Sequence, residues 1–276
     1  MPPSPRAQPE DGSVTDLLGP RSSALQHLRR LSGRRRARLE AGQFVIDGPT
    51  LVTEALAAGV DVVEVYAEPD APAEVLDAAA GAGVPVRLVE AGSLAKATSP
   101  VTPQPVAALA GLPADPPPAV LAGVVLVLVG VADPGNAGTL LRAAEASGAS
   151  AVVSCADAVD LWNPKCVRAS AGSLFRVPVV RAGSVEDALA RLRDAGMTLV
   201  ATTLDDAVDL DDADLTGSVA VLLGNEAHGL PAEVVAAADV TVRIPMAGRV
   251  ESLNVAMTGT VVAFEAARQR RAGAGG

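Results

Sequence analysis

Hydrophobic residues fall in short, almost continuous runs, and these runs alternate with segments in which hydrophobic residues recur at helical spacing. Runs without a polar residue at every second position indicate strands buried on both faces of a parallel sheet. In the first part of the chain we predict strands at 43–47, 62–67 and 84–89 and helices at 49–58 and 73–82. In the second part we predict strands at 124–129, 151–155, 177–180, 199–202, 219–223 and 240–244 and helices at 136–147, 185–195 and 253–270. The alternation predicts an α/β fold with helices on both faces of a parallel sheet.

A proline-rich stretch, Pro-Ala-Asp-Pro-Pro-Pro at 113–118, separates the two parts of the chain. Such a stretch cannot continue a helix and favours an extended linker. We therefore predict a small α/β domain at 21–112 and a larger domain, containing the parallel sheet, at 119–276. Residues 1–20 carry no apolar run and are rich in Pro, Asp and Ser, so we expect a disordered tail.

The composition agrees with this fold and excludes several classes of protein. Of the 276 residues, 49% are hydrophobic but only 2% are aromatic, so burial depends on aliphatic packing. Cys155 and Cys166 are too few for a disulfide framework and match no zinc-ligand spacing, so we expect buried thiols and no metal. We find no targeting segment and no apolar run of membrane-spanning length, and we expect a cytoplasmic protein that does not bind membranes.

The formal charge of −10 at first disfavours a nucleic-acid partner, because phosphate neutralisation needs a basic surface. The charges are segregated, however: seven arginines and no acid lie between Arg21 and Arg38, whereas six aspartates crowd into 205–214. This basic arm is either a solvated helix face or a surface that binds RNA phosphates. The candidate RNA-binding residues are Arg29, Arg30, Arg34, Arg35, Arg36 and Arg38.

A first motif, Asp-Pro-Gly-Asn-Ala-Gly-Thr-Leu-Leu-Arg at 133–142, follows a predicted strand and opens a predicted helix. Its glycines, Gly135 and Gly138, could let backbone N–H groups meet an anion at the helix N-terminus. A nucleotide-dependent oxidoreductase would then place its ribose-binding acid near Asp157. The spacing is G-x-x-G and not G-x-G-x-x-G, and no phosphate-loop lysine follows, which disfavours nucleotide binding.

A second motif, Leu-Gly-Asn-Glu-Ala-His-Gly-Leu at 223–230, follows another strand of the same predicted sheet. Gly224 permits close backbone approach, and Glu226 is a carboxylate at the carboxyl edge of the sheet, where α/β proteins bind ligands. Alternatively, the polar residues of this motif merely cap a helix that starts near Pro231.

A third motif, Ile-Pro-Met-Ala-Gly-Arg-Val-Glu-Ser-Leu-Asn-Val at 244–255, follows the last predicted strand. Ser252 takes the expected N-cap position of the final helix, and by itself the motif could be an ordinary capped helix. An ordinary cap does not explain why Asn136, Glu226, Ser252 and Asn254 come to the same edge of one sheet.

In order and spacing, the three motifs resemble those of the SpoU/TrmH family of RNA ribose methyltransferases, part of the SPOUT superfamily, over about residues 122–270. The segment 165–180, with Arg-Ala-Ser-Ala-Gly and Val-Pro-Val, is similar to the family's segment between motifs one and two. Gln-Phe-Val-Ile-Asp-Gly-Pro at 43–49 and Val-Thr-Pro-Gln at 101–104 resemble the substrate-binding domain of the ribosomal-RNA members. Where the family often has Pro-Gln-Gly, this chain has Pro-Gln-Pro at 103–105, a departure in the RNA-binding half.

The resemblance implies 2′-O-methylation of a ribose in structured RNA, most of all 23S ribosomal RNA, with S-adenosyl-L-methionine as the cofactor. It also implies a carboxyl-terminal sheet threaded into a trefoil knot and a homodimer through the carboxyl-terminal domain, with RNA at the subunit interface. The residues that it assigns to the cofactor are Thr202, Gly224, Ile244, Met246 and Leu253. The residues that it assigns to catalysis are Asn136, Arg142, Glu226, Ser252 and Asn254.

Methyl transfer to a ribose requires a weakly acidic hydroxyl to be made nucleophilic. The family assigns this task to the arginine that matches Arg142, but a guanidinium stays protonated near neutral pH and is a poor base. We therefore expect Arg142 to stabilise the developing alkoxide and the neighbouring phosphate. Asn136, which we place in the turn before the helix, would help to orient Arg142 and the ribose, together with Glu226, Ser252 and Asn254.

Two other functions fit the same fold. A transfer-RNA 2′-O-methyltransferase would share the chemistry, although the separate amino-terminal domain favours ribosomal RNA. A non-catalytic RNA-binding or ribosome-assembly factor would share the fold, but the presence of both Asn136 and Arg142 favours an enzyme.

Overall fold

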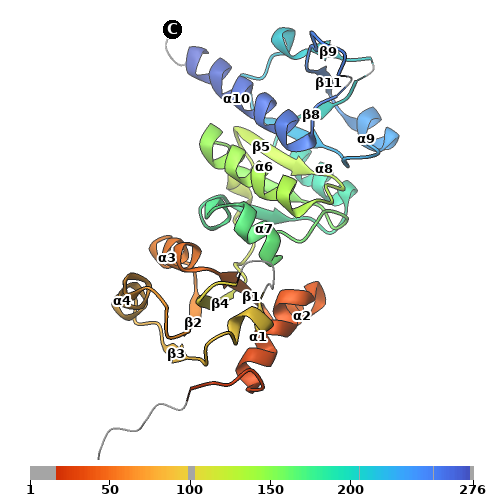
Figure 1. Cartoon of the computed structure of the whole chain (residues 1–276). Coiled ribbons are helices and arrows are strands. Elements are labelled where there is room, and N and C mark those ends of the chain that lie inside the picture. Colours follow the sequence, from red (N-terminus) through yellow and green to blue (C-terminus); the bar gives the residue numbers. More distant parts are fainter. Residues whose placement is uncertain (1–16, 99–102, 205, 251, 274–276) are drawn as a thin grey trace, which may run out of the picture.

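The computed structural model describes residues 17–98, 103–204, 206–250 and 252–273 and shows two sheets, each with its own helices (Figure 1). Three expectations touch residues outside these ranges, namely most of the tail at 1–20, the first half of the match at 101–104, and Asp205 of the acidic segment. The first sheet belongs to the amino-terminal domain and the second to the carboxyl-terminal domain.

The amino-terminal domain is a four-stranded sheet in the order β1-β4-β2-β3, in which β4 pairs antiparallel with both neighbours and β3 pairs parallel with β2. Its elements are α1 (Ser23–Gly33), α2 (Arg35–Ala41), β1 (Gln43–Asp47), α3 (Pro49–Ala57), β2 (Val62–Ala67), α4 (Ala73–Gly81), β3 (Val86–Leu88), α5 (Leu94–Ala97) and β4 (Val106–Gly111). One face of the sheet packs on α1 and α5, and the other packs on α3 and α4.

The carboxyl-terminal domain is a seven-stranded parallel sheet in the order β7-β6-β5-β10-β8-β11-β9. Its strands are β5 (Val124–Leu128), β6 (Ala151–Ser154), β7 (Val179–Arg181), β8 (Thr198–Thr202), β9 (Val208–Asp209), β10 (Val219–Leu223) and β11 (Val240–Arg243). Its helices are α6 (Pro134–Ser147), α7 (Pro164–Ala169), α8 (Val185–Asp194), α9 (Ala232–Ala237) and α10 (Val255–Gly273), and short 3-10 turns lie at Pro118–Val120, Ser173–Phe175 and Leu210–Asp212.

The central strands of this sheet are buried on both faces, as their continuous hydrophobic runs predict. Every residue of β5 and β10 is buried. Alternate residues of β5 face opposite cores: Leu126 lies in the core with α6, α7 and α10, whereas Val127 lies in the core with α8 and α9. Figure 1 shows α6 and α10 side by side on one face of the sheet. The predicted fold class is therefore confirmed.

The predicted strands all occur, with ends that shift by at most two residues. The pattern missed the central strand β4, since its sequence Val-Ala-Ala-Leu-Ala-Gly is rich in alanine, which is uncommon in strands. It also missed α1, because the arginines dominated that segment. Leu25, Leu28 and Leu31 recur at helical spacing and are fully buried, so the basic arm is an integral part of the amino-terminal core.

The predicted disordered tail at 1–20 extends too far. The backbone N–H of Leu18 donates to the carbonyl of Leu88 at 3.0 Å, and Glu90 returns a bond to Leu18 at 3.1 Å. These bonds attach residues 17–20 to the edge of the first sheet, since β3 has no other neighbour in the described part of that sheet.

The two cysteines are buried, as the composition predicts. Cys155 and Cys166 are free and buried, and burial raises the pKa of each thiol to about 12. Among the residues that the structure describes, no helix has both the length and the apolar character that a membrane crossing requires.

Candidate functional site

The three motifs meet at one edge of the seven-stranded sheet. Motif one follows β5, motif two follows β10 and motif three follows β11, and β5 and β10 are direct neighbours in the parallel sheet. The carboxyl ends of parallel strands lie at the same edge, so the loops after these strands converge. From β5 the chain adds β6 and β7 on one side of the sheet, and the later strands β10, β8, β11 and β9 lie on the other side of β5. Ligand sites in open α/β sheets form at such changes of direction.

Glu226 joins motif two to motif one. Its Oε2 accepts the backbone N–H of Ala132 at 3.0 Å, and its Oε1 accepts the N–H of Asp133 at 3.0 Å and the side-chain amide of Asn136 at 2.9 Å. The amide oxygen of Asn136 in turn accepts the Nδ2 of Asn254 at 3.0 Å, which adds motif three. We call Glu226, Asn136 and Asn254 the amide network.

The surroundings of Glu226 keep it ionised. Partial burial disfavours its charge, but the hydrogen bonds from the Asn136 side chain and the backbone N–H groups outweigh that effect and lower the pKa of Glu226. The amide network therefore has one fixed negative charge that is bound only by neutral donors.

Carboxylates of the chain itself bind several N–H groups at the start of α6. Asp133 caps this helix and accepts the N–H of Asn136 at 2.9 Å, while Glu226 accepts the N–H groups of Ala132 and Asp133 before the helix. A β-carbon added to Gly138 would lie 2.4 Å from the Cβ of Ala169, so this glycine allows α6 and α7 to pack closely. Two carboxylates at this turn disfavour the phosphate-binding role considered for it, and with it the dinucleotide alternative.

The loop of motif two folds on itself and does not cap the next helix. The backbones of Asn225 and Gly229 exchange two hydrogen bonds of 2.9 Å, and the side chain of Asn225 donates to the carbonyl of Gly130 at 2.8 Å. α9 begins at Ala232 without a side-chain cap, so the capping alternative for this motif is wrong. A β-carbon on Gly224 would lie 2.3 Å from the carbonyl carbon of Gly229, which confirms the predicted close approach.

The N-cap of the final helix is Asn254, and the prediction of Ser252 for this position is wrong. α10 starts at Val255, and the Oδ1 of Asn254 accepts the N–H of Ala256 at 2.9 Å. Asn254 can cap the helix and bind Asn136 at once because its amide has separate acceptor and donor atoms. Ser252 lies exposed beside the cavity described next.

A cavity of about 410 Å³ opens beside the amide network, and its wall includes Glu226. Valine, leucine and isoleucine side chains line one part of it, and loop backbone with threonine side chains lines another. This mixture suits a ligand with an apolar body and several polar groups. All five residues that the resemblance assigns to the cofactor line this cavity: Thr202, Gly224, Ile244, Met246 and Leu253.

Arg142 lies apart from the amide network. Asn136 belongs to the first turn of α6 and not to the turn before it, which corrects our expectation. Arg142 follows Asn136 by six positions, which corresponds to about 9 Å along the helix axis and to a different face. Arg142 is exposed, and its guanidinium makes no hydrogen bond or ion pair with any residue that the structure describes. The two side chains therefore do not meet within one chain.

The arginines of the basic arm divide into two groups. Arg38 is only 2% exposed and pairs with Asp160 of the other domain, so this guanidinium is not free for phosphate, which corrects the expectation for Arg38. Arg35 donates to the carbonyls of Ala156 and Ala158 across the same contact. Of the six candidate RNA-binding arginines, Arg29, Arg30, Arg34 and Arg36 are exposed and make no hydrogen bond or ion pair with the described residues of the other domain.

Sequence reasoning missed the groups that hold the network in place. The N–H donors of Ala132 and Asp133 carry no side-chain signal, although Asp-Pro at the start of motif one is typical of an N-cap followed by the first helical residue. Asn225, whose side chain holds the loop of motif two against Gly130, was read only as a possible cap.

Comparisons with known proteins match both domains. The model of the SpoU rRNA Methylase family matches residues 123–264, and the model of the MRM3-like substrate binding domain matches residues 23–108. An uncharacterized tRNA/rRNA methyltransferase of Synechocystis is 34% identical over 266 residues, which is 94% of each chain. A 23S rRNA (uridine(2479)-2′-O)-methyltransferase of Streptomyces viridochromogenes is 42% identical over 145 residues, which is 51% of this chain and 50% of that relative.

A solved structure extends the similarity over nearly the whole chain. The SpoU methyltransferase AviRb from Streptomyces viridochromogenes, in complex with the cofactor AdoMet, superposes with a TM-score of 0.81 at 31% identity. The superposition covers 91% of this chain and 99% of that structure.

Proposed function

The chain belongs to the SpoU rRNA methylase family, and we propose that it transfers a methyl group from S-adenosyl-L-methionine to the 2′-hydroxyl of a ribose in RNA. The observation that carries the proposal is the amide network, which brings all three motifs into contact and whose Glu226 lines the 410 Å³ cavity. The activity depends on the bound cofactor for its methyl group, and the residues of the chain supply binding and orientation.

The cavity fits S-adenosyl-L-methionine in both size and chemistry. Gly224 lines the cavity and lets the backbone of Gly229 and Leu230 pack against it, which shapes the wall, and Ile244 and Leu253 supply apolar surface for an adenine ring. Thr202 and Met246 complete the set of five that we assign to the cofactor. The bound cofactor supplies an electrophilic methyl group on a sulfonium, whose departure as a neutral thioether needs no acid.

The amide network orients the reactants. Glu226 fixes the turn before α6 through two backbone N–H groups, and it fixes the Asn136 amide through a third bond. Asn136 and Asn254 are thereby held in a set geometry through Glu226, which lines the cavity, and their free lone pairs and protons can position a ribose. We assign Ser252, which lies exposed beside the cavity, to the same task.

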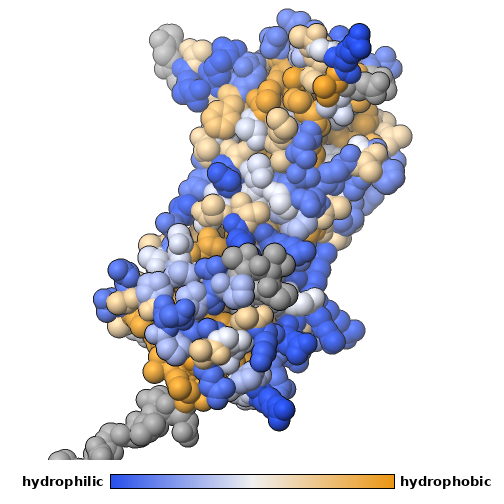
Figure 2. All heavy atoms as spheres, viewed as in Figure 1, coloured by the Kyte–Doolittle hydropathy of each residue, from blue (hydrophilic) through white to orange (hydrophobic). Residues whose placement is uncertain are grey.

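Arg142 stabilises the negative charge that develops on the ribose oxygen and the neighbouring phosphate. It stands on the exposed face of α6 with Thr139 and Ala146, beside the exposed apolar stripe of α10. Figure 2 shows hydrophobic surface gathered over α10 and the adjoining strand ends. The exposed stripe consists of Met257, Val261 and Phe264, which are 56%, 40% and 43% exposed.

This stripe supports the homodimer, because exposed hydrophobic residues at positions i, i+4 and i+7 form one face for another helix. A second copy packed there would cover Arg142 and place it at the subunit interface, where RNA is expected to bind. The trefoil knot in the carboxyl-terminal sheet remains a prediction of the family resemblance.

Ribosomal RNA is the proposed substrate. The match to the SpoU rRNA Methylase model favours rRNA, and the name of the Streptomyces relative favours 23S rRNA in particular; such a substrate implies a cytoplasmic site of action. The exposed arginines Arg29, Arg30, Arg34 and Arg36 would bind RNA phosphates. Transfer RNA is the second candidate, because the Synechocystis relative is named for both substrates.

The test is transfer of a labelled methyl group to protein-free 23S rRNA and, separately, to bulk tRNA, followed by nucleoside digestion and mass spectrometry. We expect one 2′-O-methyl nucleoside in the rRNA pool, and its loss with Arg142→Ala while S-adenosyl-L-methionine still binds. Product in the tRNA pool alone would replace the substrate assignment. Failure to bind the cofactor would refute the enzymatic function and favour a non-catalytic RNA-binding factor.

A further inference from the structure

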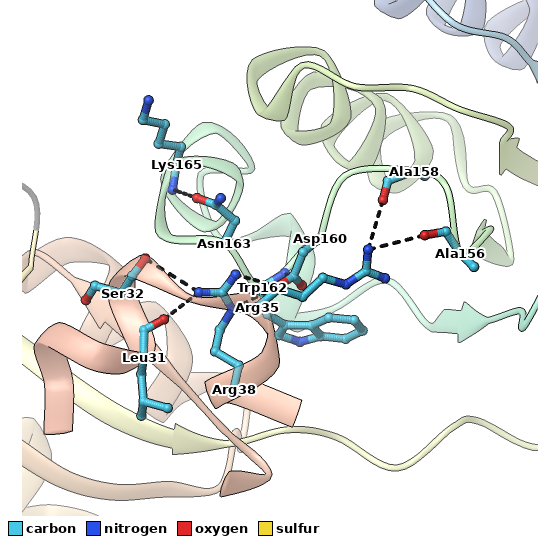
Figure 3. Close-up of polar contacts among 10 residues, drawn as sticks. All are labelled: Leu31, Ser32, Arg35, Arg38, Ala156, Ala158, Asp160, Trp162, Asn163 and Lys165. Carbon is cyan, nitrogen blue, oxygen red and sulfur yellow. Dashed lines mark hydrogen bonds and ion pairs between the residues drawn. The ribbon is translucent and has the colours of Figure 1, made fainter. Parts of the chain in front are cut away.

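Beside apolar packing between the two domains, their contacts include a polar one in which one arginine is central. Arg38 on α2 donates its Nε and Nη2 to the Oδ2 of Asp160, at 2.8 and 2.5 Å, and its Nη1 to the carbonyl of Leu31 (Figure 3). Arg35, one turn earlier, donates to the carbonyl of Ala156 at 3.2 Å. We call the contacts that Arg35, Arg38 and Asp47 make with the carboxyl-terminal domain the domain junction.

The Arg38–Asp160 pair is buried and fixed from both sides. The Arg38 and Asp160 side chains are 3% and 11% exposed. The second carboxylate oxygen of Asp160 accepts the backbone N–H of Trp162 at 3.0 Å, so the carboxylate cannot turn without breaking a bond. Buried ion pairs often contribute little net stability but demand one geometry. This pair is therefore better suited to setting the angle between the domains than to holding them together.

Backbone bonds connect the junction to the amide network. The N–H of Val159, next to Asp160, donates to the carbonyl of Val131 at 2.8 Å. The next two residues after Val131, Ala132 and Asp133, donate their N–H groups to Glu226. The loop that receives Arg38 is thus bonded directly to the turn that holds Glu226.

A second contact reaches α6 from the same domain. Asp47 at the end of β1 accepts Arg168 of α7 at 2.6 Å, and Asp47 is 4% exposed. The residue after Arg168 is Ala169, which packs so closely on Gly138 of α6 that a β-carbon there would lie 2.4 Å away. The contact of Arg38 is therefore connected to the turn before α6, and the contact of Asp47 is connected to α6 itself.

We propose that Arg38 and Asp160 are positioning residues, which hold the amino-terminal domain at the one angle that delivers the target ribose to the amide network. The inference rests on the proposed function, because it assigns the amino-terminal domain to RNA binding. It assigns Arg38, from the arginine-rich arm, a role other than phosphate binding. The exposed arginines on α1 and α2 hold the RNA, and the buried one sets where that RNA arrives.

The first test is the steady-state kinetics of Asp160→Asn with 23S rRNA as the substrate. Asparagine keeps the shape of the side chain but removes the charge that holds Arg38. We expect kcat at saturating RNA to fall on the order of 10²-fold, as small misplacement of reactants does, while the KM for S-adenosyl-L-methionine stays within about twofold. Asp157→Asn, an exposed residue of the same loop, is the matched control and should keep the kcat of the wild type.

A double variant separates orientation from stability. Arg38→Met with Asp160→Leu removes both charges and keeps the volume, a replacement that commonly preserves or raises stability. We expect its melting temperature to match the wild type within a few degrees while kcat stays low. Small-angle scattering of the same proteins, which needs no activity, should show a larger maximum dimension or a broader distribution of interdomain distances for both variants.

The outcomes separate the two proposals. A wild-type protein that methylates no RNA sinks the proposed function, whereas scattering still decides whether the pair sets the domain angle. Wild-type kcat in Asp160→Asn at saturating RNA overturns the positioning role, and so does wild-type kcat in the double variant. A raised RNA dissociation constant for Arg38→Gln with unchanged kcat would make Arg38 an ordinary phosphate contact and would also overturn it.

Discussion

The amide network and the domain junction use similar hydrogen-bond chemistry in opposite environments. At the network, neutral amides and backbone N–H groups surround one exposed carboxylate, Glu226. At the junction, Arg38 pairs with Asp160 and Arg168 with Asp47, and Arg38 and Asp47 are buried, 2% and 4% exposed, although the Arg168 side chain is 37% exposed. Exposed neutral donors can exchange water for a ligand at small cost, whereas buried charges hold one geometry because any other leaves a charge unpaired. This difference agrees with our proposals that the first region binds the substrate and that the second fixes the angle between the domains.

The substitution with the largest expected effect on activity is Glu226→Gln in the amide network. Both oxygens of Glu226 accept a backbone N–H, one from Ala132 and one from Asp133. In the glutamine variant an NH₂ group replaces one of these oxygens, so two donors would face each other and the turn before α6 would move. We expect methyl transfer to fall on the order of 10²-fold, measured as kcat with labelled cofactor. Glu233→Gln, a change of the same kind in the first turn of α9, should have no such effect, and equal losses in both variants would contradict the assignment.

The cofactor cavity gives the next largest effect. In Gly224→Ala, the β-carbon would lie 2.3 Å from the carbonyl carbon of Gly229 and 2.4 Å from the nitrogen of Leu230, so the loop must shift. We expect the dissociation constant for S-adenosyl-L-methionine to rise about tenfold or more by calorimetry, with a loss of about 1–3 kcal/mol in unfolding free energy. Gly248→Ala is the control in motif three, because nothing lies within 4 Å of its β-carbon position.

Substitution of an exposed arginine tests whether this group, unlike the buried Arg38, binds RNA phosphates. Deleting the basic arm would remove the buried Leu25 and Leu28 and unfold the domain, so single charges are the better probe. For Arg29→Gln we expect RNA affinity to fall several-fold and the slope of log K against log salt to decrease by about one. Arg191→Gln, on α8, should leave the slope unchanged. An unchanged slope for Arg29→Gln would remove that residue from the RNA-binding surface.

The smallest effect concerns pH and the buried carboxylate of the junction. Burial raises the pKa of Asp47, and the opposing effects of Arg168 and Thr98 do not fully compensate. The folded protein therefore holds this proton more tightly than the unfolded chain, and the contribution of Asp47 to stability falls as pH rises from below its unfolded pKa through its raised folded pKa.

Asp47→Asn removes that dependence. Denaturant titrations at pH 3 and pH 7 should therefore show the variant gaining stability relative to the wild type as pH rises. Asp70→Asn, at an exposed position, serves as the control. A relative loss of stability for Asp47→Asn at the higher pH would show that its ion pair with Arg168 outweighs burial.

The same two regions differ in how far the sequence predicts them. The network was accessible because Asn136, Glu226 and Asn254 follow strand ends at recognisable spacings, and parallel strands bring such ends together. The domain junction could not be predicted from the sequence, because Arg38 and Asp160 are 122 positions apart. Nothing in a run of arginines distinguishes the buried arginine from its neighbours. Only the leucines at helical spacing indicated a buried face there.

Local competition explains the remaining errors at the site. Ser252 and Asn254 are both residue types that favour the N-cap position. Asn254 takes it because its Oδ1 can cap the helix while its Nδ2 donates to Asn136. Likewise Asn136 could join the first turn of α6 because its partners come from other strands, so it need not share a helix face with Arg142.

The 122-position separation of Arg38 and Asp160 also has a consequence in time. A ribosome adds about 5 to 20 residues each second, so α2 leaves it roughly 6 to 24 s before Asp160 is made. During that interval the nascent amino-terminal domain holds a guanidinium whose neutral partners are the carbonyls of Leu31 and Ser32 and whose carboxylate does not yet exist. Pulse proteolysis of stalled chains of increasing length should show protection of this domain rising in two steps, the second after Asp160 emerges. During synthesis, the amino-terminal domain therefore reaches its final stability only after Asp160 of the second domain has been made.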